Sequence, residues 1–254
     1  MSGTTLVIPC YNEAARLDQV ALRAFVDGRP DVNLLLVNDG STDATEACLR
    51  ALAAERPGRI DVLSLPANAG KAEAVRQGLR AALAGGATTV GYFDADLSTP
   101  TGEMARLLDV LAARGAEVVM GARVALLGVD IRRQAARHYL GRVFASVASL
   151  VLKTRVYDTQ CGAKLFRRSP ALDAALETPF RSRWAFDVEL LGRLLAGAPG
   201  VPATRPEAII EVPLEIWRDV PGSKLKPTAM VGAAKDLTLI GIDLAARRRR
   251  AGGG

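Results

Sequence analysis

The chain has 254 residues, of which 49% are hydrophobic, and no linker-like stretch divides it, so we expect one domain, residues 1–254, with one sizeable core. Its three cysteines lie far apart without ligand spacing, which argues against a disulfide framework or a zinc site and fits a reducing cytoplasm. The N-terminus lacks a signal-peptide pattern, and no run reaches the ~18 apolar residues of a membrane span. We therefore expect neither a secreted nor an integral membrane protein.

The net charge is +6, and part of it lies in four consecutive arginines, Arg247 to Arg250. Such a run suits any polyanion, whether anionic lipid, nucleic acid or an acidic substrate, and a solvated tail is an equally good interpretation. We expect residues 247–254 to form a basic, disordered tail. Aromatic residues make up only 5% of the chain and form no patch interleaved with basic ones, so we expect no nucleic-acid partner.

The first half of the chain alternates between two kinds of segment. Short apolar runs, mostly without charge, are typical of strands that are covered on both faces. Five such runs are predicted strands: 4–9, 33–37, 60–65, 88–93 and 117–121. Between them, apolar residues recur at helical spacing, as in 17–25, 44–51 and 107–111. This alternation predicts an α/β fold with a mainly parallel sheet, flanked by helices and joined by right-handed crossovers.

Polar residues follow four of the predicted strands. They are Pro9-Cys10-Tyr11-Asn12-Glu13, Asn38-Asp39-Gly40-Ser41-Thr42-Asp43, Asn68-Ala69-Gly70-Lys71 and Asp94-Ala95-Asp96. Each cluster alone is ordinary turn or helix-start chemistry, but the carboxyl ends of parallel strands meet at one crevice, where ligands bind. Neither a P-loop nor a Gly-X-Gly-X-X-Gly motif is present. The paired carboxylates instead suit a divalent cation that carries a diphosphate.

In this order the four clusters resemble glycosyltransferase family two, whose GT-A fold has a Rossmann-like nucleotide-binding half. Motifs of the second half are similar to the dolichyl-phosphate glucosyltransferase branch of polyprenyl-phosphate glycosyltransferases. They are Asp158-Thr159-Gln160-Cys161-Gly162-Ala163-Lys164-Leu165-Phe166, Trp184-Ala185-Phe186-Asp187-Val188-Glu189-Leu190-Leu191, Glu211-Val212-Pro213 and Gly222-Ser223-Lys224-Leu225. The resemblance implies a nucleotide-sugar-binding half, 1–125, and an acceptor-binding half with amphipathic helices, 126–246.

Three departures from the family pattern matter. The eukaryotic relatives carry an N-terminal membrane anchor that this chain lacks, which argues against constitutive membrane attachment. Ala72 and Glu73 replace two glycines, so the backbone there is expected to approach a ligand less closely. Ala163 replaces the usual phenylalanine, which leaves room for a different acceptor or a repacked core.

The resemblance also implies a donor site. The residues expected to bind the nucleotide are Pro9, Tyr11, Glu13, Asp39, Lys71 and Asp94. Asp39 would accept a hydrogen bond from the uracil imide, because a carboxylate favours a base with an N–H donor. Asp96 would ligate Mg²⁺ or Mn²⁺ on the diphosphate, with Asp94 beside it on the ribose or on a metal-bound water.

An acceptor that is a lipid phosphate is already ionised near neutral pH, so it needs positioning rather than a strong base. Arg123 matches the Gly-Ser-Arg position of the family and Asp158 opens its most specific motif, so the resemblance implies that both act with Asp96 in catalysis. A structural cap or salt bridge is the alternative for Asp158. The resemblance to polyprenyl-phosphate transferases also implies that Arg133, Arg218 and Lys224 clamp the acceptor phosphate. Arg132 and Arg137 are nearly as good candidates as Arg133. The single histidine, His138, is not expected to be a base.

Two amphipathic segments, 139–151 and 230–244, have apolar stripes next to basic residues. That pattern fits a helix on an anionic membrane surface and equally fits a helix packed on the sheet, which we favour for the second.

We expect an inverting, metal-dependent transfer of glucose from UDP-glucose to a polyprenyl phosphate at the inner membrane face, although the residues do not identify the sugar. Transfer to a soluble hydroxyl, with Asp158 or Asp187 as the base, is one rival. A non-catalytic protein that binds a nucleotide or a polyanion is another.

Overall fold

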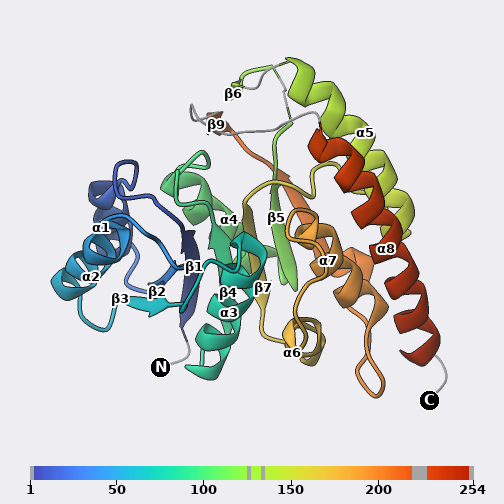
Figure 1. The fold of residues 1–254 in the computed structure, drawn as a ribbon, viewed down its shortest axis with the longest axis horizontal. Helices are drawn as coiled ribbons and strands as arrows, with labels where there is room; N and C mark the ends of the chain where they lie inside the picture. The colour runs from blue at the N-terminus through green and yellow to red at the C-terminus, as the bar shows by residue number, and fades with distance from the viewer. Residues whose placement is uncertain (1–2, 125–126, 133–134, 219–227, 252–254) are drawn as a thin grey trace.

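The computed structural model describes residues 3–124, 127–132, 135–218 and 228–251 (Figure 1). The strands are β1 (Thr4–Cys10), β2 (Val32–Asn38), β3 (Ile60–Ser64), β4 (Thr89–Phe93), β5 (Val118–Ala122), β6 (Asp130–Arg132), β7 (Ala163–Arg167), β8 (Ile209–Pro213) and β9 (Ile216–Arg218). The helices are α1 (Gln19–Gly28), α2 (Thr45–Glu55), α3 (Lys71–Ala84), α4 (Thr101–Arg114), α5 (Ala135–Leu152), α6 (Pro170–Leu176), α7 (Phe186–Ala196), the 3-10 turn η1 (Pro206–Ala208) and α8 (Thr228–Ala251).

Seven of the described strands form one sheet in the order β3-β2-β1-β4-β7-β5-β8, and β6 and β9 form a separate parallel pair. Within the large sheet, β7 runs antiparallel to both of its neighbours and the other strands are parallel. The prediction of a mainly parallel α/β sheet is confirmed. The five predicted strands also appear, with ends shifted by at most one residue.

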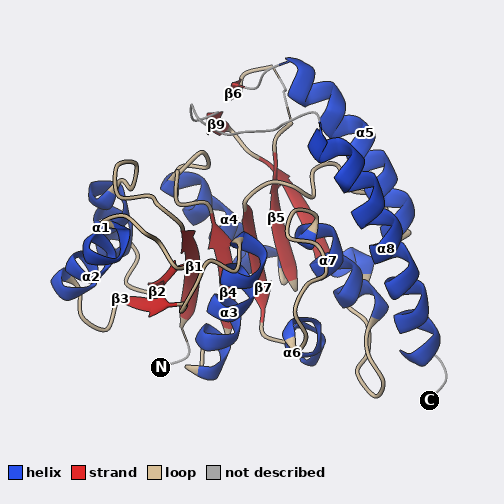
Figure 2. Ribbon diagram, in the orientation of Figure 1, coloured by secondary structure: helices blue, strands red, loops and turns tan. Residues whose placement is uncertain are grey.

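Both faces of the sheet are covered by helices, which explains the almost charge-free strands (Figure 2). Leu6 and Ile8 of β1 point into a core with α1, α2 and α4, whereas Val7 between them points into a core with α3, α5, α6, α7 and α8. The carboxyl ends of the parallel strands are left at one edge, where loops can build a site.

Strand β7 comes from the second half of the chain but lies between β4 and β5. Its first residue, Ala163, is opposite Phe93, the last residue of β4. The two halves that the resemblance implies therefore share one sheet, and the segment before β7 meets the Asp94 loop.

The arginine run is not a disordered tail, because α8 continues through residues 247–251. Arg247 donates to the carbonyl of Gly197 at the end of α7, and Arg248 donates to the carbonyl of Leu152 at the end of α5. Carbonyls at the end of a helix have no partner within the helix, and a cation there is stabilised by the helix dipole. The tail prediction is wrong for these residues because the arginines find acceptors that the sequence does not reveal.

Helix α8 packs through Leu237, Ile240 and Leu244, which are buried. Leu244 fits against Gly192 of α7, where a Cβ atom would come within 2.2 Å of it. The second amphipathic stripe therefore packs, as expected, although on neighbouring helices rather than directly on the sheet. Within the described residues, no helix is long and apolar enough to cross a bilayer.

Candidate active site

The ends of β1 to β4 line one pocket of about 410 Å³, a size typical of small-molecule sites. Its lining residues are Pro9, Cys10, Tyr11, Glu13, Asp39, Asn68, Gly70, Lys71, Asp94, Ala95 and Asp96. The structure thus brings together every residue that was predicted to bind the nucleotide or the metal. Arg123, Asp158 and Arg218 were predicted to act here but are not among the lining residues.

Asp39 ties the end of β2 to the loop that precedes α3. Its carboxylate accepts hydrogen bonds from the backbone N–H groups of Ala69 and Gly70, both at 2.8 Å, and from Nδ2 of Asn68 at 3.0 Å. Gly40, at φ +61°, packs so closely on this loop that a Cβ atom would lie 2.4 Å from its backbone. Asp39 therefore shapes the pocket wall, a role that its sequence position did not indicate. Its contact with a uracil imide stays a prediction.

Glu13 supplies an acceptor without a partner. Its Oε1 atom accepts from Arg16 at 2.6 Å, while Oε2 is buried and has no hydrogen-bond partner among the described residues. Burial raises the pKa of Glu13, against the effect of Arg16. Because Glu13 lines the pocket, an oxygen in need of a donor there fits a ribose hydroxyl group.

The two acidic residues after β4 present oxygen ligands in the pocket. Asp94 pairs with Lys71 at 2.5 Å, and Asp96 accepts two hydrogen bonds from Ser98 through a single oxygen, Oδ1. Burial opposes the charged form of Lys71, but Asp94 and Asp187 outweigh it and raise the pKa of the ammonium group. No cluster of three or more metal-ligating side chains occurs in the described part of the chain. A hard cation such as Mg²⁺ or Mn²⁺ fits two carboxylates here if diphosphate and water supply its other ligands.

Gly162, just before β7, makes room for the Asp94 carboxylate. A Cβ atom at this position would lie 2.1 Å from Oδ2 of Asp94, and the Gly162 carbonyl accepts from the Asp94 N–H at 3.2 Å. Any larger residue would displace that carboxylate. The glycine of the Gln160-Cys161-Gly162 motif therefore leaves space for the Asp94 carboxylate, a role that the motif alone does not indicate.

A buried ion pair supports the same strand. Nζ of Lys164 donates to Asp187 at 2.5 Å and to the carbonyl of Cys161 at 2.7 Å, and Lys164 is fully buried. The hydroxyl group of Tyr92 also donates to Asp187, and burial together with Asp187 raises the pKa of Tyr92. The pair holds the peptide next to Gly162. In the sequence, a lysine within an apolar strand is the feature that indicates such a pair, because a buried ammonium group needs an anionic partner.

Arg123 and Asp158 are paired with each other. Nε and one terminal nitrogen of Arg123 lie 2.6 and 2.8 Å from the two oxygens of Asp158, and both side chains are largely buried. Burial opposes the charge of Arg123, but Asp158 outweighs it and raises the pKa of the guanidinium group. The salt bridge considered as the alternative for Asp158 is therefore present. A direct catalytic role for either residue stays a prediction.

Of the three residues predicted to clamp the acceptor phosphate, only Arg218 can be placed. Arg133 and Lys224 lie outside the described residues. The Arg218 side chain is exposed and lies 3.4 Å from Asp130, while its backbone N–H donates to the carbonyl of Ser98 at 3.0 Å. This bond connects β9 to the loop that carries Asp96. The acceptor role of all three residues remains a prediction.

A mainly parallel sheet that presents paired carboxylates in a nucleotide-sized pocket is the arrangement of the GT-A class. A family model described as "Glycosyl transferase family 2" matches residues 5–173. The chain therefore belongs to glycosyltransferase family 2.

Curated relatives and solved structures agree with this assignment. A dolichyl-phosphate beta-glucosyltransferase, ALG5C, of Trichomonas vaginalis is 32% identical and aligns over 94% of this chain and 71% of its own length. A polyprenol monophosphomannose synthase of Mycolicibacterium smegmatis is 28% identical over 76% of this chain and 72% of its own. The crystal structure of Mycobacterium tuberculosis glucosyl-3-phosphoglycerate synthase, in complex with Mn²⁺, UDP and glucosyl-3-phosphoglycerate, has a TM-score of 0.68, with 19% identity over 96% of this chain and 80% of that one. The last comparison confirms the GT-A fold.

Proposed function

We propose that the protein transfers glucose from UDP-glucose to a polyprenyl phosphate, with inversion and with Mg²⁺ or Mn²⁺ held by Asp94 and Asp96. The names of the relatives point to a lipid phosphate acceptor, and the pocket fits a nucleotide diphosphate. In a single displacement, an acceptor oxygen bonds to the anomeric carbon as the bond to UDP breaks on the opposite face. The bound metal would offset the negative charge that develops on the departing UDP.

The choice of a phosphate acceptor rests on one observation: both candidate bases are paired with buried cations. Asp158 is held by Arg123, and Asp187 is held by Lys164. A hydroxyl acceptor would have to give its proton to one of them, and the corresponding buried cation would lose its anion. Breaking a buried pair costs about 3–5 kcal/mol. A phosphate acceptor arrives ionised and avoids this cost, so the arrangement favours it over the hydroxyl rival.

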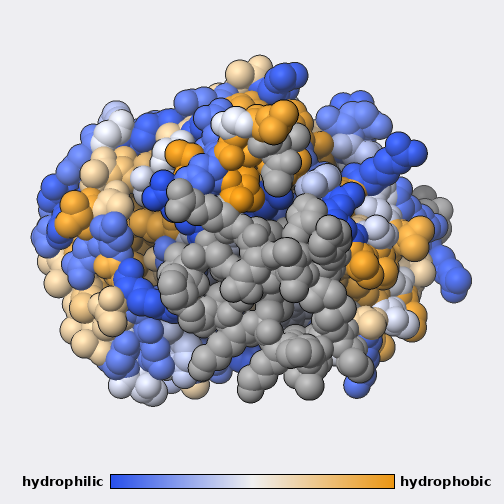
Figure 3. Space-filling view, turned by 90° about the horizontal axis from the view of Figure 1, so that it is seen from above, coloured by the Kyte–Doolittle hydropathy of each residue, from blue (hydrophilic) through white to orange (hydrophobic). Residues whose placement is uncertain are grey.

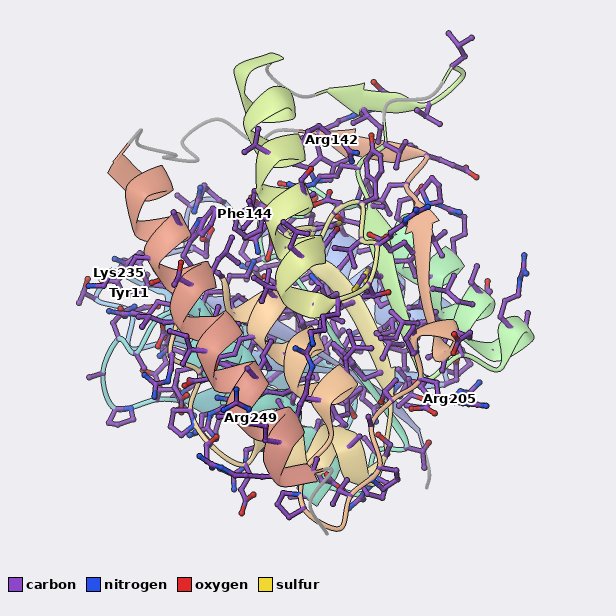
Figure 4. The ribbon with its side chains drawn as sticks, turned by 90° about the vertical axis from the view of Figure 1, so that its right-hand side faces the viewer. Tyr11, Arg142, Phe144, Arg205, Lys235 and Arg249 are labelled. Carbon is purple, nitrogen blue, oxygen red and sulfur yellow. The ribbon has the colours of Figure 1, made fainter. Side chains whose placement is uncertain are left out.

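A peripheral contact with the membrane belongs to the same proposal, because a polyprenyl phosphate resides in a bilayer. Val143 and Leu150 of α5 and Ile242 of α8 are exposed by 61%, 78% and 61%. Helices α5 and α8 lie side by side in Figure 4, where Arg142 and Arg249 are labelled on them. Apolar and hydrophilic residues alternate on the right of Figure 3, the side on which these helices lie. Apolar side chains among basic ones suit an anionic lipid surface.

The first test is transfer of labelled sugar into an organic-extractable product, with undecaprenyl phosphate as acceptor and Mg²⁺ or Mn²⁺ present. UDP-glucose, GDP-mannose and UDP-N-acetylglucosamine are compared as donors. Label from UDP-glucose that disappears in Asp96→Asn is the expected result. Release of UDP without labelled lipid would favour transfer to a soluble acceptor. Binding of UDP without any turnover would favour a non-catalytic nucleotide-binding protein.

Membrane contact has its own measurement. We expect the protein to co-sediment with vesicles that contain phosphatidylglycerol and to bind pure phosphatidylcholine vesicles far less. Leu150→Asp should reduce that binding, since it places a carboxylate on the exposed stripe without touching the core. Equal sedimentation of both proteins would mean that this face does not meet lipid.

A further inference from the structure

Arg183 lies against the wall of the pocket, although no motif in the sequence singled it out. It belongs to the segment between α6 and α7 and reaches across to the loop before α3. Its guanidinium nitrogens lie 2.6 and 2.7 Å from the position that a Cβ atom on Gly70 would take, and it donates to Oδ1 of Asn68 at 3.3 Å. Gly70 and Asn68 both line the pocket. The absence of a side chain at Gly70 therefore gives this guanidinium its place.

Among the residues that the structure describes, no carboxylate pairs with Arg183. Its side chain donates a hydrogen bond to Asn68 and makes no other there. The contrast with its neighbour is clear, because Arg181, two residues earlier, pairs with Asp243 on α8. An amide oxygen satisfies one donor of a guanidinium group but does not compensate its charge, and several donors of the fork stay available for an anion.

The backbone that carries Arg183 is held in place from both sides. The Ser182 hydroxyl group accepts from the N–H groups of Trp184 and Ala185, at 3.2 and 2.7 Å, and donates to Asp236 of α8. The Trp184 ring packs edge-on against Phe144 of α5, with ring centroids 5.0 Å apart. Because this backbone is already fixed, only the exposed side chain of Arg183 has to become ordered when it binds a ligand.

The charge of the pocket shows what such an arginine can do. The acidic residues that line it are Glu13, Asp39, Asp94 and Asp96, and the basic one is Lys71, which already pairs with Asp94. A nucleotide diphosphate and an acceptor phosphate would add further negative charge. One divalent metal does not balance that sum, so an additional cation at the wall would favour the binding of phosphate groups. Arginine is well suited, because its fork matches phosphate oxygens.

We propose that Arg183 binds a phosphate oxygen in this pocket, either of the donor diphosphate or of the acceptor phosphate. The inference rests on the proposed function, in which both groups meet there. A merely structural role would act through Asn68, which also donates to Asp39 and so shapes the pocket wall. The two roles differ in one respect: only direct binding depends on a phosphate group in the ligand.

The experiment compares Arg183→Met with the wild type in the affinity for UDP and for uridine, each in the presence of Mn²⁺. Binding to the donor diphosphate predicts at least tenfold weaker binding of UDP and unchanged binding of uridine. Binding to the acceptor predicts unchanged affinity for both and an at least tenfold higher KM for undecaprenyl phosphate. Arg183→Lys keeps the charge and should recover part of either loss. Arg181→Met, the matched control, should stay within twofold of the wild type throughout.

An equal loss of affinity for UDP and uridine would overturn the inference in favour of a structural role. Unchanged affinities together with an unchanged KM for the acceptor would also overturn it. The comparison of UDP with uridine measures binding and needs no turnover. It therefore shows whether Arg183 binds the donor diphosphate even if the wild type labels no lipid. In that case the proposed acceptor fails separately, and the comparison of UDP with uridine alone decides: unchanged affinity for UDP in Arg183→Met then overturns the inference.

Discussion

Replacing Gly162 with alanine tests whether the residue before β7 positions Asp94, a carboxylate proposed to hold the metal. The new Cβ atom would lie 2.1 Å from Oδ2 of Asp94 and 2.4 Å from its carboxylate carbon, whereas ordinary contacts begin near 3.4 Å. Asp94 must therefore retreat by about 1 Å, and a displacement of that size costs on the order of 10²-fold in rate. That factor corresponds to about 2.7 kcal/mol of transition-state stabilisation. Gly162 is not among the glycines with positive φ, so alanine fits the backbone itself.

The assay is the initial rate of sugar transfer as a function of Mn²⁺ concentration. We expect kcat/KM to fall about 100-fold and the Mn²⁺ concentration for half-maximal rate to rise. Gly102→Ala is the matched control, because it lies in the first turn of α4 with nothing within 4 Å of its Cβ position. That control should retain full activity. A Gly162→Ala enzyme with wild-type rate and metal dependence would refute the claim that this contact positions Asp94.

Three further predictions concern stability and reactivity. Lys164→Met leaves a buried carboxylate without its cation and should lower the free energy of unfolding by about 3–5 kcal/mol in urea titrations; a loss below 1 kcal/mol would contradict a buried pair. Arg248→Ala should lower the free energy of unfolding by about 1–2 kcal/mol, measured as a lower thermal midpoint, because the arginine loses its carbonyl acceptors at the end of α5. KM for UDP-glucose should not change, since those acceptors do not line the pocket. Burial raises the pKa of Cys10 to about 12 and that of Cys161 to about 11, so both thiols stay protonated at pH 8. Iodoacetamide should therefore label the native protein at Cys48 alone, which mass spectrometry of the digested protein would show.

Local pattern was enough to predict the layers of the fold and which residues meet in the pocket. Apolar runs and helical stripes determine where strands and helices form, and the parallel direction of the strands then places the carboxyl ends of β1 to β4 at one edge. The polar clusters after those strands had to meet there, as the pocket that contains Asp39 and Asp94 confirms. The family resemblance depended on the same residues.

Long-range pairing decided what the sequence could not reveal. Nothing local indicates that β7 runs antiparallel between β4 and β5, yet that register puts Gly162 against Asp94. The partners of Asp158 and of Arg183 likewise come from distant segments. A side chain's charge can be read from the sequence, but whether that charge is compensated depends on what the fold brings within hydrogen-bond distance. The sequence by itself therefore determined which residues line the pocket proposed for the donor, and only the tertiary structure decided that Asp158 and Asp187 are paired with cations and that Arg183 is not paired with a carboxylate among the described residues.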